Sequence, residues 1–135
     1  MLFDANAIAQ FLLEKNQRET RQVQLQIEVV AETASTNLDL MQRTAQLQTP
    51  VLRVAEHQTA GRGRAGRSWL SSPGAVLTFS MAWHFDKLAQ SLSAVPLVVG
   101  VAVAECLRQI GVQVHLKWPN DILKEGKKLA GILVE

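Results

Sequence analysis

The stretch Gly61-Arg62-Gly63-Arg64-Ala65-Gly66-Arg67, followed by Trp69, interleaves three glycines with three arginines. It lies between a predicted strand at 51–56 and the turn-forming sequence Ser-Ser-Pro-Gly at 71–74. Glycine permits positive φ angles and lets a backbone approach a ligand closely. Arginine presents a planar set of donors that fits carboxylates and phosphates. The stretch therefore predicts a mobile loop that closes over an anion.

The same stretch satisfies G-x-G-x-x-G, the pattern of dinucleotide-binding proteins. That pattern requires a helix directly behind the loop and an acidic residue about 20 positions later. Here residues 71–74 break a helix, and the next acidic residue, Asp86, lies beyond another predicted strand. We therefore reject the dinucleotide interpretation. A solvated basic loop and an Arg/Gly segment that binds nucleic acid remain alternatives at this point.

The composition narrows these alternatives. A chain of 135 residues with 47% hydrophobic residues is one domain or part of one, with enough apolar residues for a core. A net charge of +2 and 5% aromatic residues argue against a nucleic-acid partner. The single cysteine, Cys106, excludes a disulfide within the chain, which is typical of a reducing cytoplasm, and we expect it to be buried and unreactive.

Metal, secretion and membrane signals are weak. His57, His84 and His115 are far apart and no cysteine pair accompanies them, so a zinc site has little support. The N-terminus lacks the basic region of a signal peptide. The longest uncharged apolar run, 94–104, is too short to span a bilayer. We therefore expect a soluble cytoplasmic protein that binds no membrane.

Periodicity and capping residues predict a mixture of helices and strands. Helices are expected from a cap at Asp4 to about 14, from the cap-competent residues 35–37 to about 47, and from 94 to 110. Strands are expected at 23–29, 51–56, 75–85 and 112–117, with a hairpin formed by 122–124 and 128–134. A polar connector is expected at 15–22. This order indicates an α+β fold with a mixed, largely antiparallel sheet packed against helices.

Three of these elements carry further expectations. The first strand should have one wet face, formed by Gln24, Gln26 and Glu28. The helix at 94–110, capped by Ser93 and ended by Gly111, is apolar almost all round in its first half, so it should pack against the sheet rather than lie on the surface. The last strand is apolar on both faces, which is typical of a central strand, although the sequence stops at Glu135. The sequence therefore looks like the first part of a larger domain.

Five segments stand in an informative order: 35–37, Gln58, 61–67, 117–121 and 128–131. Together they resemble the biotin protein ligase family, within the biotin/lipoate ligase superfamily. The resemblance covers 29–135, and its sequences GRGRAGRSW, KWPNDI and KLAGILVE are each rather specific. It implies a class II synthetase-like fold that is truncated at the C-terminus. Residues 1–135 would be a single domain, the N-terminal portion of the catalytic domain, without an N-terminal helix-turn-helix domain or a C-terminal β domain.

The resemblance also implies a reaction. Members of the family use ATP and Mg²⁺ to activate biotin as biotinyl-5′-AMP and then transfer it to a lysine of a biotin carboxyl carrier protein, here that of acetyl-CoA carboxylase. The attacking carboxylate and the α-phosphate are both anionic, so catalysis depends on positioning and on neutralising charge. A lipoate or octanoate ligase and a non-catalytic biotin-binding fragment are the alternatives. A homodimer is left open, and no nucleic-acid partner is expected.

The resemblance assigns roles to individual residues. Lys128 and Arg62 would be catalytic. Residues in contact with biotin would be Ser35, Thr36, Asn37, Gln58, Gly61, Arg62, Gly63, Arg64, Lys128 and Gly131. Residues in contact with ATP would be Arg64, Arg67, Trp69, Lys117 and Asn120. No residue is assigned to the metal.

Simpler interpretations exist for several of these residues. Helix capping requires only one of the three residues 35–37. Lys128 and its neighbour Lys127 could simply flank the hairpin turn, and Lys117 could be a solvated lysine. Asp121 could be a turn residue or a neighbour of magnesium. Trp118 and Pro119 are expected to be structural and to form the bend that presents Asn120.

Overall fold

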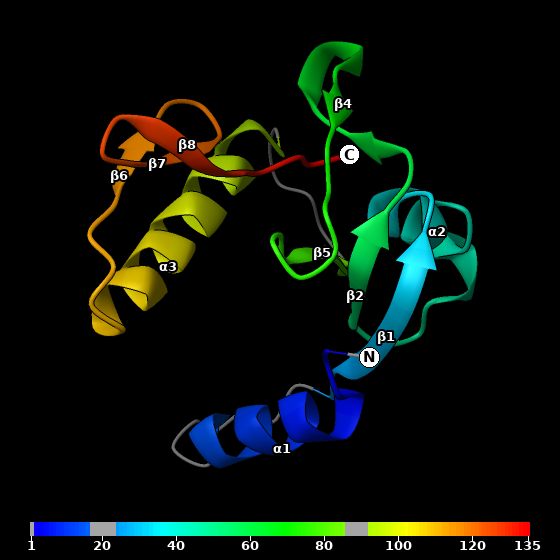
Figure 1. The fold of residues 1–135 in the computed structure, drawn as a ribbon. Helices are drawn as coiled ribbons and strands as arrows, with labels where there is room; N and C mark the ends of the chain where they lie inside the picture. The colour runs from blue at the N-terminus through cyan, green and yellow to red at the C-terminus, as the bar shows by residue number, and fades with distance from the viewer. Residues whose placement is uncertain (1, 17–23, 86–91) are drawn as a thin grey trace. The chain divides into compact units, whose positions relative to one another are not determined.

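The computed structural model describes residues 2–16, 24–85 and 92–135. The chain divides into two compact units, Met1–Arg62 with Arg67–Phe85 and Gly63–Gly66 with Asp86–Glu135 (Figure 1). The predicted connector at 15–22 and the start of the first predicted strand lie largely outside the described residues. The assignment of 1–135 to a single domain stays a prediction.

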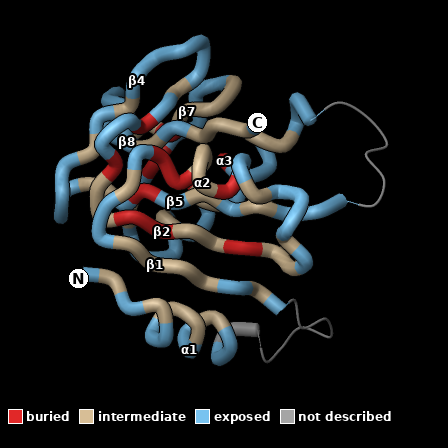
Figure 2. The backbone as a smooth tube through the Cα atoms, turned by 90° about the vertical axis from the view of Figure 1, so that its right-hand side faces the viewer, coloured by how far each residue is buried: buried red, intermediate tan, exposed pale blue. Residues whose placement is uncertain are grey.

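The first unit is built on a mixed three-stranded sheet. Its order is β1 (Gln26–Thr33), β2 (Val51–Gln58) and β5 (Thr78–Ala82), with β1 parallel and β5 antiparallel to β2. The short helix α2 (Thr36–Met41) connects β1 to β2 and packs against β2 and β5. Figure 2 shows buried residues along β2, where Val51, Val54 and Ala55 join Leu40 of α2 in the core. The predicted α+β class is confirmed.

Helix α1 (Ala5–Asn16) begins as predicted, since the Asp4 carboxylate accepts hydrogen bonds from the backbone N–H groups of Asn6 and Ala7. Helix α2 is shorter than predicted, because it ends at Met41 rather than near 47. The chain then forms the 3₁₀ turn η1 (Thr44–Gln46). Two contacts explain the early end: the Thr44 hydroxyl donates to the Met41 carbonyl, and the Arg43 guanidinium binds Glu28 of β1.

The glycine–arginine stretch, predicted as a loop, contains regular structure. Strand β3 (Gly61–Arg62) pairs antiparallel with β4 (Ser68–Trp69), and the 3₁₀ turn η2 (Arg64–Gly66) lies between them. Ala65 and Gly66 both have positive φ, at 57° and 71°. A left-handed alanine followed by a glycine reverses the chain tightly enough for the two short strands to pair.

The second unit combines a helix with an antiparallel sheet. The 3₁₀ turn η3 (Leu92–Ala94) leads into α3 (Val95–Gln109), and β6 (His115–Lys117), β7 (Asp121–Lys124) and β8 (Lys127–Gly131) form a sheet in that order. Ala104, Val114 and Ile122 are its buried core. The turn between β7 and β8 places Glu125 and Gly126 at φ 50° and 76°, which confirms the predicted hairpin. Strand β8 pairs with β7 within the described sheet, and its expected place in the middle of a larger sheet stays a prediction.

Helix α3 ends as predicted, with Gly111 at φ 85°, but its start and its surroundings differ from the prediction. The N-cap position is Ala94 and not Ser93, and a proline in the first turn supplies the helical φ without a side-chain cap. Only the small residues Gly100 and Ala104 are buried, while Val98 is 66% exposed and Cys106 is exposed. The prediction of a buried cysteine is therefore wrong, because the helix contacts β6 and β7 through one narrow stripe.

The apolar segment around α3 is also longer than the 94–104 run that the sequence analysis considered. Residues Leu92–Gln109 form a helical segment of 18 residues that is long and apolar enough to cross a membrane, by length and composition only. Core helices of soluble proteins meet the same criterion, so this property by itself assigns no location.

Candidate functional site

The first unit holds a buried polar cluster built around Thr36 and Gln58. The backbone N–H of Thr36 donates to Gln58 Oε1 at 2.8 Å, and the Thr36 hydroxyl donates to the same oxygen at 3.0 Å. The Thr36 hydroxyl also lies 2.8 Å from the Ser80 hydroxyl. Thr36 is 2% exposed and Gln58 is 9% exposed. Two hydrogen bonds to Oε1 fix which end of the Gln58 amide faces Thr36, so the amide has one defined orientation.

Ser35 lies at the N-cap position of α2. Its backbone is extended, with φ −161° and ψ 125°, and its Oγ accepts from the N–H of Leu38 at 3.4 Å. Thus, of the three cap-competent residues, Ser35 caps α2 and Thr36 binds Gln58. Asn37 is half-buried in the first turn of the same helix.

Gly61 of β3 lies against both β4 and the Gln58 amide. A Cβ atom at position 61 would lie 2.5 Å from the Trp69 carbonyl oxygen and 3.0 Å from Gln58 Nε2. Any side chain there would force the backbone or the Gln58 amide to move. The neighbouring strand therefore requires this glycine even without a ligand, and Arg62 beside it is exposed.

Two serines of this cluster were not among the predicted site residues. Ser71, interpreted as a turn residue, accepts a hydrogen bond from the backbone N–H of Gln58 at 3.3 Å. Ser80 lies in β5 between Phe79 and Met81, both about half exposed. The alternation of β5 places Ser80 on the opposite face from these apolar residues, and that pattern could have identified it.

A cluster of charged residues adjoins α2. Arg43 donates from both terminal nitrogens to the Glu28 carboxylate, and Arg53 bridges Glu28 Oε2 at 3.0 Å and Asp39 Oδ2 at 2.8 Å. The hydrogen bond from Arg43 lowers the pKa of Glu28 despite the opposing effect of burial, and Arg53 lowers it further. The expectation of a wet face at Glu28 is therefore wrong, because these guanidinium groups cover it. The register of β1 and β2, which pairs Glu28 with Arg53, provides the cause.

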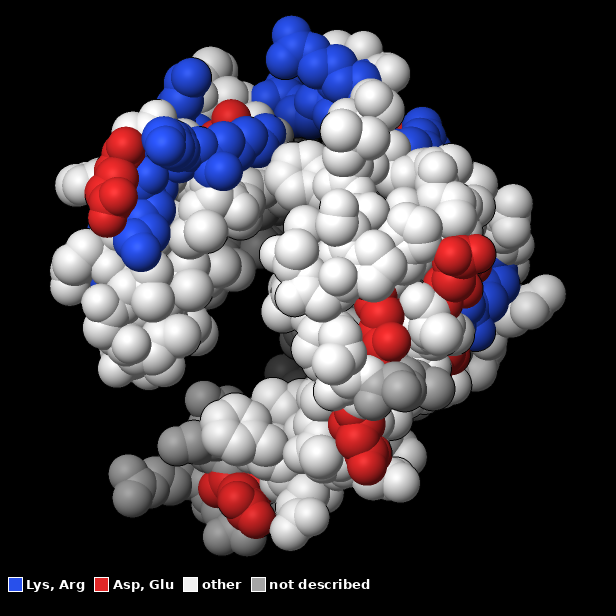
Figure 3. Space-filling model, viewed as in Figure 1, with Lys and Arg blue, Asp and Glu red and all other residues white. Residues whose placement is uncertain are grey.

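In the second unit Lys128 has a carboxylate beside it. Its Nζ lies 2.8 Å from Asp121 Oδ1, and the two side chains are 43% and 23% exposed. Asp121 opens β7, where it faces Lys117 on one side and Gly131 on the other. Asp121 is thus a strand residue with a cationic partner rather than a turn residue. Figure 3 shows lysine and arginine side chains, both blue, gathered over the sheet β6–β8, and others over the turn between β3 and β4.

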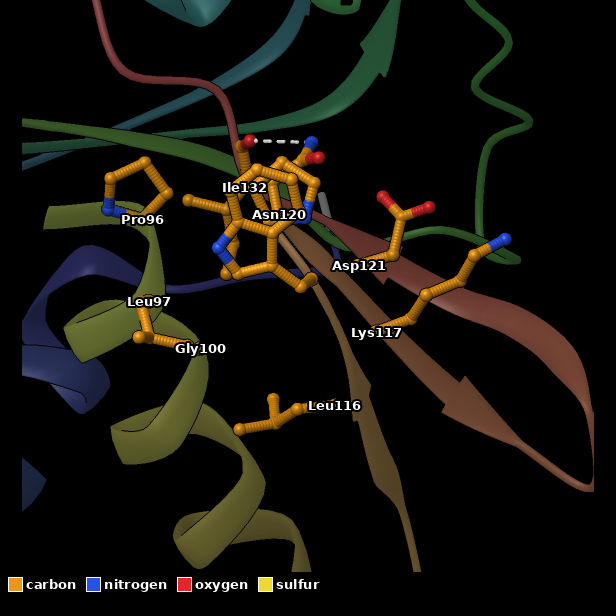
Figure 4. A pocket seen from close by; sticks show the side chains of 10 residues that line it. Pro96, Leu97, Gly100, Leu116, Lys117, Asn120, Asp121 and Ile132 are labelled. Carbon is orange, nitrogen blue, oxygen red and sulfur yellow. Dashed lines mark hydrogen bonds between the residues drawn. The ribbon is translucent and has the colours of Figure 1, made fainter. Parts of the chain in front are cut away.

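Asn120 makes three contacts within the second unit. Its Oδ1 accepts from Arg64 Nη1 at 3.0 Å, its Nδ2 donates to the Ile132 carbonyl at 3.0 Å, and its backbone carbonyl accepts from the Ile132 N–H. Figure 4 shows the side-chain bond to Ile132. Asn120 therefore has a structural role, because it fastens the segment after β8 to the start of β7. The bend formed by Trp118 and Pro119 precedes it, and the peptide bond between those two residues is cis.

The hollow beside Asn120 is too small for a substrate. It is lined by Gly100 of α3, Leu116, Asp121 and Ile132, among others, and has a volume of about 10 Å³ (Figure 4). That volume holds about one water molecule. Among the described residues no group of three or more histidine, cysteine, aspartate or glutamate side chains could hold a metal ion.

The predicted site residues are divided between the two units. In the first unit lie Ser35, Thr36, Asn37, Gln58, Gly61, Arg62, Arg67 and Trp69, and in the second lie Gly63, Arg64, Lys117, Asn120, Lys128 and Gly131. Within the first set Thr36 contacts Gln58, and Gly61 lies against Trp69 and Gln58. Within the second, Arg64 contacts Asn120, whereas Lys128 is paired with Asp121, which was expected to be a turn residue or a neighbour of magnesium.

Comparison with known proteins adds a family to this geometry. Residues 26–135 match the biotin/lipoate A/B protein ligase family. The chain is 45% identical over 102 residues to the bifunctional ligase/repressor BirA of Escherichia coli K12, an alignment that covers 75% of this chain and 32% of BirA. It is 42% identical over 117 residues to the biotin–[acetyl-CoA-carboxylase] ligase of Mycobacterium tuberculosis, covering 82% of this chain and 44% of that protein. The chain thus spans between a third and a half of the length of these relatives.

Solved structures agree. The chain superposes with a TM-score of 0.73 and 32% identity on the biotin acetyl coenzyme A carboxylase synthetase of Helicobacter pylori with bound biotinylated ATP, covering 83% of this chain and 55% of that one. The biotin protein ligase of Aquifex aeolicus in complex with biotin and ATP gives a TM-score of 0.69 and 37% identity, with 82% and 46% coverage. On these matches and on the sequences that carry them, the chain belongs to the biotin/lipoate A/B protein ligase family.

Proposed function

We propose that this chain carries the biotin-recognition and adenylation residues of a biotin–protein ligase. Such an enzyme activates biotin with ATP as biotinyl-5′-AMP and transfers it, in the cytoplasm, to a lysine of the biotin carboxyl carrier protein of acetyl-CoA carboxylase. The observation that carries the proposal is the buried Gln58 amide, which Thr36 holds in one orientation. The names of the relatives point to the same substrates, biotin and ATP.

The polar cluster fits the ureido ring of biotin better than the dithiolane of lipoate. Thr36 occupies Gln58 Oε1, which leaves Nε2 as the donor of that amide, and Ser35 Oγ accepts from Leu38, which leaves its proton to donate. A ureido carbonyl can accept from both groups, whereas a dithiolane offers no comparable acceptor. Buried polar groups left without partners strongly penalise the wrong ligand. The cluster therefore favours biotin.

The positively charged residues fit the adenylation step. Lys128 and Arg62 would neutralise the biotin carboxylate and the α-phosphate while the carboxylate oxygen attacks phosphorus and pyrophosphate leaves. Lys128 Nζ is partly exposed and paired with the Asp121 carboxylate. On ligand binding it would leave Asp121 and pair with the carboxylate of biotin. Asn37, Gly61, Gly63, Arg64 and Gly131 would complete the biotin contacts, and Arg64, Arg67, Trp69, Lys117 and Asn120 would serve ATP.

Magnesium fits this site only as a companion of the phosphates. The described residues offer no cluster of three metal-binding side chains, and Mg²⁺ typically binds through one or two carboxylates plus substrate phosphates. When bound there, the ion would supply charge neutralisation on the phosphate oxygens.

Titration calorimetry of the purified chain tests the proposal, with biotin first, then biotin with magnesium–ATP, and lipoate as the control ligand. We expect saturable biotin binding that tightens with ATP, and no lipoate binding. Lys128→Ala should then abolish formation of biotinyl-5′-AMP, and Lys127→Ala, on the same strand, should leave it within about twofold. If Lys128→Ala retains more than about a tenth of the adenylation rate, the role assigned to Lys128 is wrong. A folded chain that binds no biotin would contradict the proposed function of this chain.

A further inference from the structure

Asp39 joins helix α2 to the strands on either side of it. Its Oδ2 accepts a hydrogen bond from the Thr33 hydroxyl at 2.8 Å and another from Arg53 Nε, also at 2.8 Å. Thr33 is the last residue of β1 and Arg53 lies in β2. One carboxylate oxygen therefore connects three elements, although Asp39 itself has no part in the polar cluster of Thr36 and Gln58.

The connection fixes the turn that presents Thr36. Thr33 lies two residues before the N-cap Ser35, and it pairs with Gln58 in the register of β1 and β2. Its carbonyl accepts from the N–H of Thr59, so the backbone of Thr33 is fastened to the end of β2. The hydrogen bond between the Thr33 hydroxyl and Asp39 closes residues 33–39, which include Thr36, into a short loop.

Helix α2 needs such an external tie. It has six residues. An isolated helix of that length is unstable in water, because its few hydrogen bonds do not offset the unfavourable free energy of forming the first turn. Arg53 strengthens the tie because its own position is set by Glu28, whose Oε2 lies 3.0 Å from Arg53 Nη1. The side chains of Arg53, Glu28 and Asp39 are 19%, 16% and 24% exposed, so solvent screens these pairs less than pairs on an open surface.

We propose that Asp39 is a positioning residue for biotin recognition. Held by Arg53 and Thr33, it keeps the first turn of α2 where the N–H and hydroxyl of Thr36 orient the Gln58 amide. Asp39 acts through Thr36 and does not touch the ligand. The inference rests on the proposed function for its ligand, but the geometry it describes is independent of that ligand.

The test compares variants of the full chain by biotin titration. Asp39→Ala removes both contacts, and Thr33→Val removes one hydroxyl while keeping the shape of the side chain. We expect each to raise the Kd for biotin by about tenfold, since a hydrogen bond to a charged group is lost in each. Thr33→Ser, which retains the hydroxyl, should restore an affinity within about twofold of the original. The matched control is Arg43→Gln, which breaks the neighbouring pair with Glu28 and removes neither hydrogen bond of Asp39.

Amide hydrogen exchange at Thr36 separates this inference from the proposed function. The Thr36 N–H donates to Gln58 Oε1 in the ligand-free protein. The protection of this N–H against exchange therefore reports how firmly Thr36 orients the Gln58 amide when no biotin is bound. We expect protection to fall in Thr33→Val and Asp39→Ala by about tenfold and to stay unchanged in Arg43→Gln. If the parent chain binds no biotin but these changes occur, the proposed function fails and the positioning role stands. The inference is overturned by unchanged Thr36 protection in Thr33→Val, or by an equal loss of affinity in Arg43→Gln.

Discussion

Replacing Gly61 with alanine should damage both the fold of the first unit and its ligand affinity. The new Cβ would lie 2.5 Å from the Trp69 carbonyl oxygen and 3.0 Å from Gln58 Nε2. The nearer atom belongs to the backbone of β4, which cannot swing away as a flexible side chain could. Overpacking of this kind costs about 1–3 kcal/mol of unfolding free energy, and the first contact places Gly61→Ala toward the upper end.

Gly66→Ala is the matched control for this substitution. Position 66 has φ +71° but no heavy atom within 4 Å of a built Cβ, so alanine there is strained without clashing. Its cost should be about 1 kcal/mol, the usual penalty for a left-handed residue with a side chain. The two variants thus add the same methyl group five residues apart, and only one of them meets a neighbour.

Chemical denaturation followed by tryptophan fluorescence measures the stability of both variants, and biotin titration measures the ligand site. Gly61→Ala should lose more unfolding free energy than Gly66→Ala and should also weaken biotin binding, because the displaced Gln58 amide no longer presents Nε2 as before. Gly66→Ala should leave biotin affinity within about twofold. Equal stability of the two variants, or unchanged biotin affinity in Gly61→Ala, would refute the close packing of β3 and β4 against Gln58.

Three further predictions concern single residues. The pKa of Glu28 is lowered from 4.5, chiefly by the hydrogen bond from Arg43, so its stabilisation is complete above that value and is lost as the pH falls through the lower folded pKa. Acid titration of unfolding free energy should therefore be steeper below about pH 5 in the parent chain than in Glu28→Gln. Asn120→Ala should cost about 1–2 kcal/mol, measured by denaturation, since the Ile132 carbonyl loses its side-chain donor; a cost below about 0.5 kcal/mol would show that this bond is not formed in solution. Arg64→Ala should weaken retention of ATP or the adenylate and leave biotin affinity largely intact. An equal loss of biotin affinity would contradict the assignment of Arg64 chiefly to the phosphates.

The sequence predicts well those features that depend on neighbours along the chain. Asp4 as a cap, Gly111 as a helix end and Gly126 in a hairpin turn each follow from one residue's backbone preference, and the structure has all three. The alternation of β5 likewise identifies the face that Phe79 and Met81 share. Such features can be read from a sequence because they require no knowledge of which distant segments meet.

Features that depend on distant partners could not be predicted. The end of α2 at Met41 depends on Arg43 turning toward Glu28, fifteen residues earlier. The exposure of Cys106 depends on which stripe of α3 faces β6 and β7. Apolar periodicity indicates that a helix has a buried face, but it does not indicate how much of an almost entirely apolar helix will be covered.

The candidate site follows the same division. The chemistry of its residues could be assigned by resemblance, because Gln58, Gly61 and Lys128 stand in recognisable sequences. The immediate partners of the site residues could not be predicted, because their contacts form only in the folded chain. These partners are Ser71, Ser80, Asp39 and Asp121. These partners are small or acidic residues in strands, turns and a short helix, positions where the same residue types commonly serve solubility or capping alone.

These contacts change the meaning of the recognisable sequences themselves. Gly61 is required by the Trp69 carbonyl, and Asn120 is held by Ile132 and Arg64, before any ligand is considered. Loss of activity in a variant at either position would therefore not by itself demonstrate contact with a substrate. Replacing a residue that contacts the ligand should lower ligand affinity without a matching loss of unfolding free energy. Replacing a residue that shapes the site should lower both. Measuring both quantities on each variant is what separates the two roles in this protein.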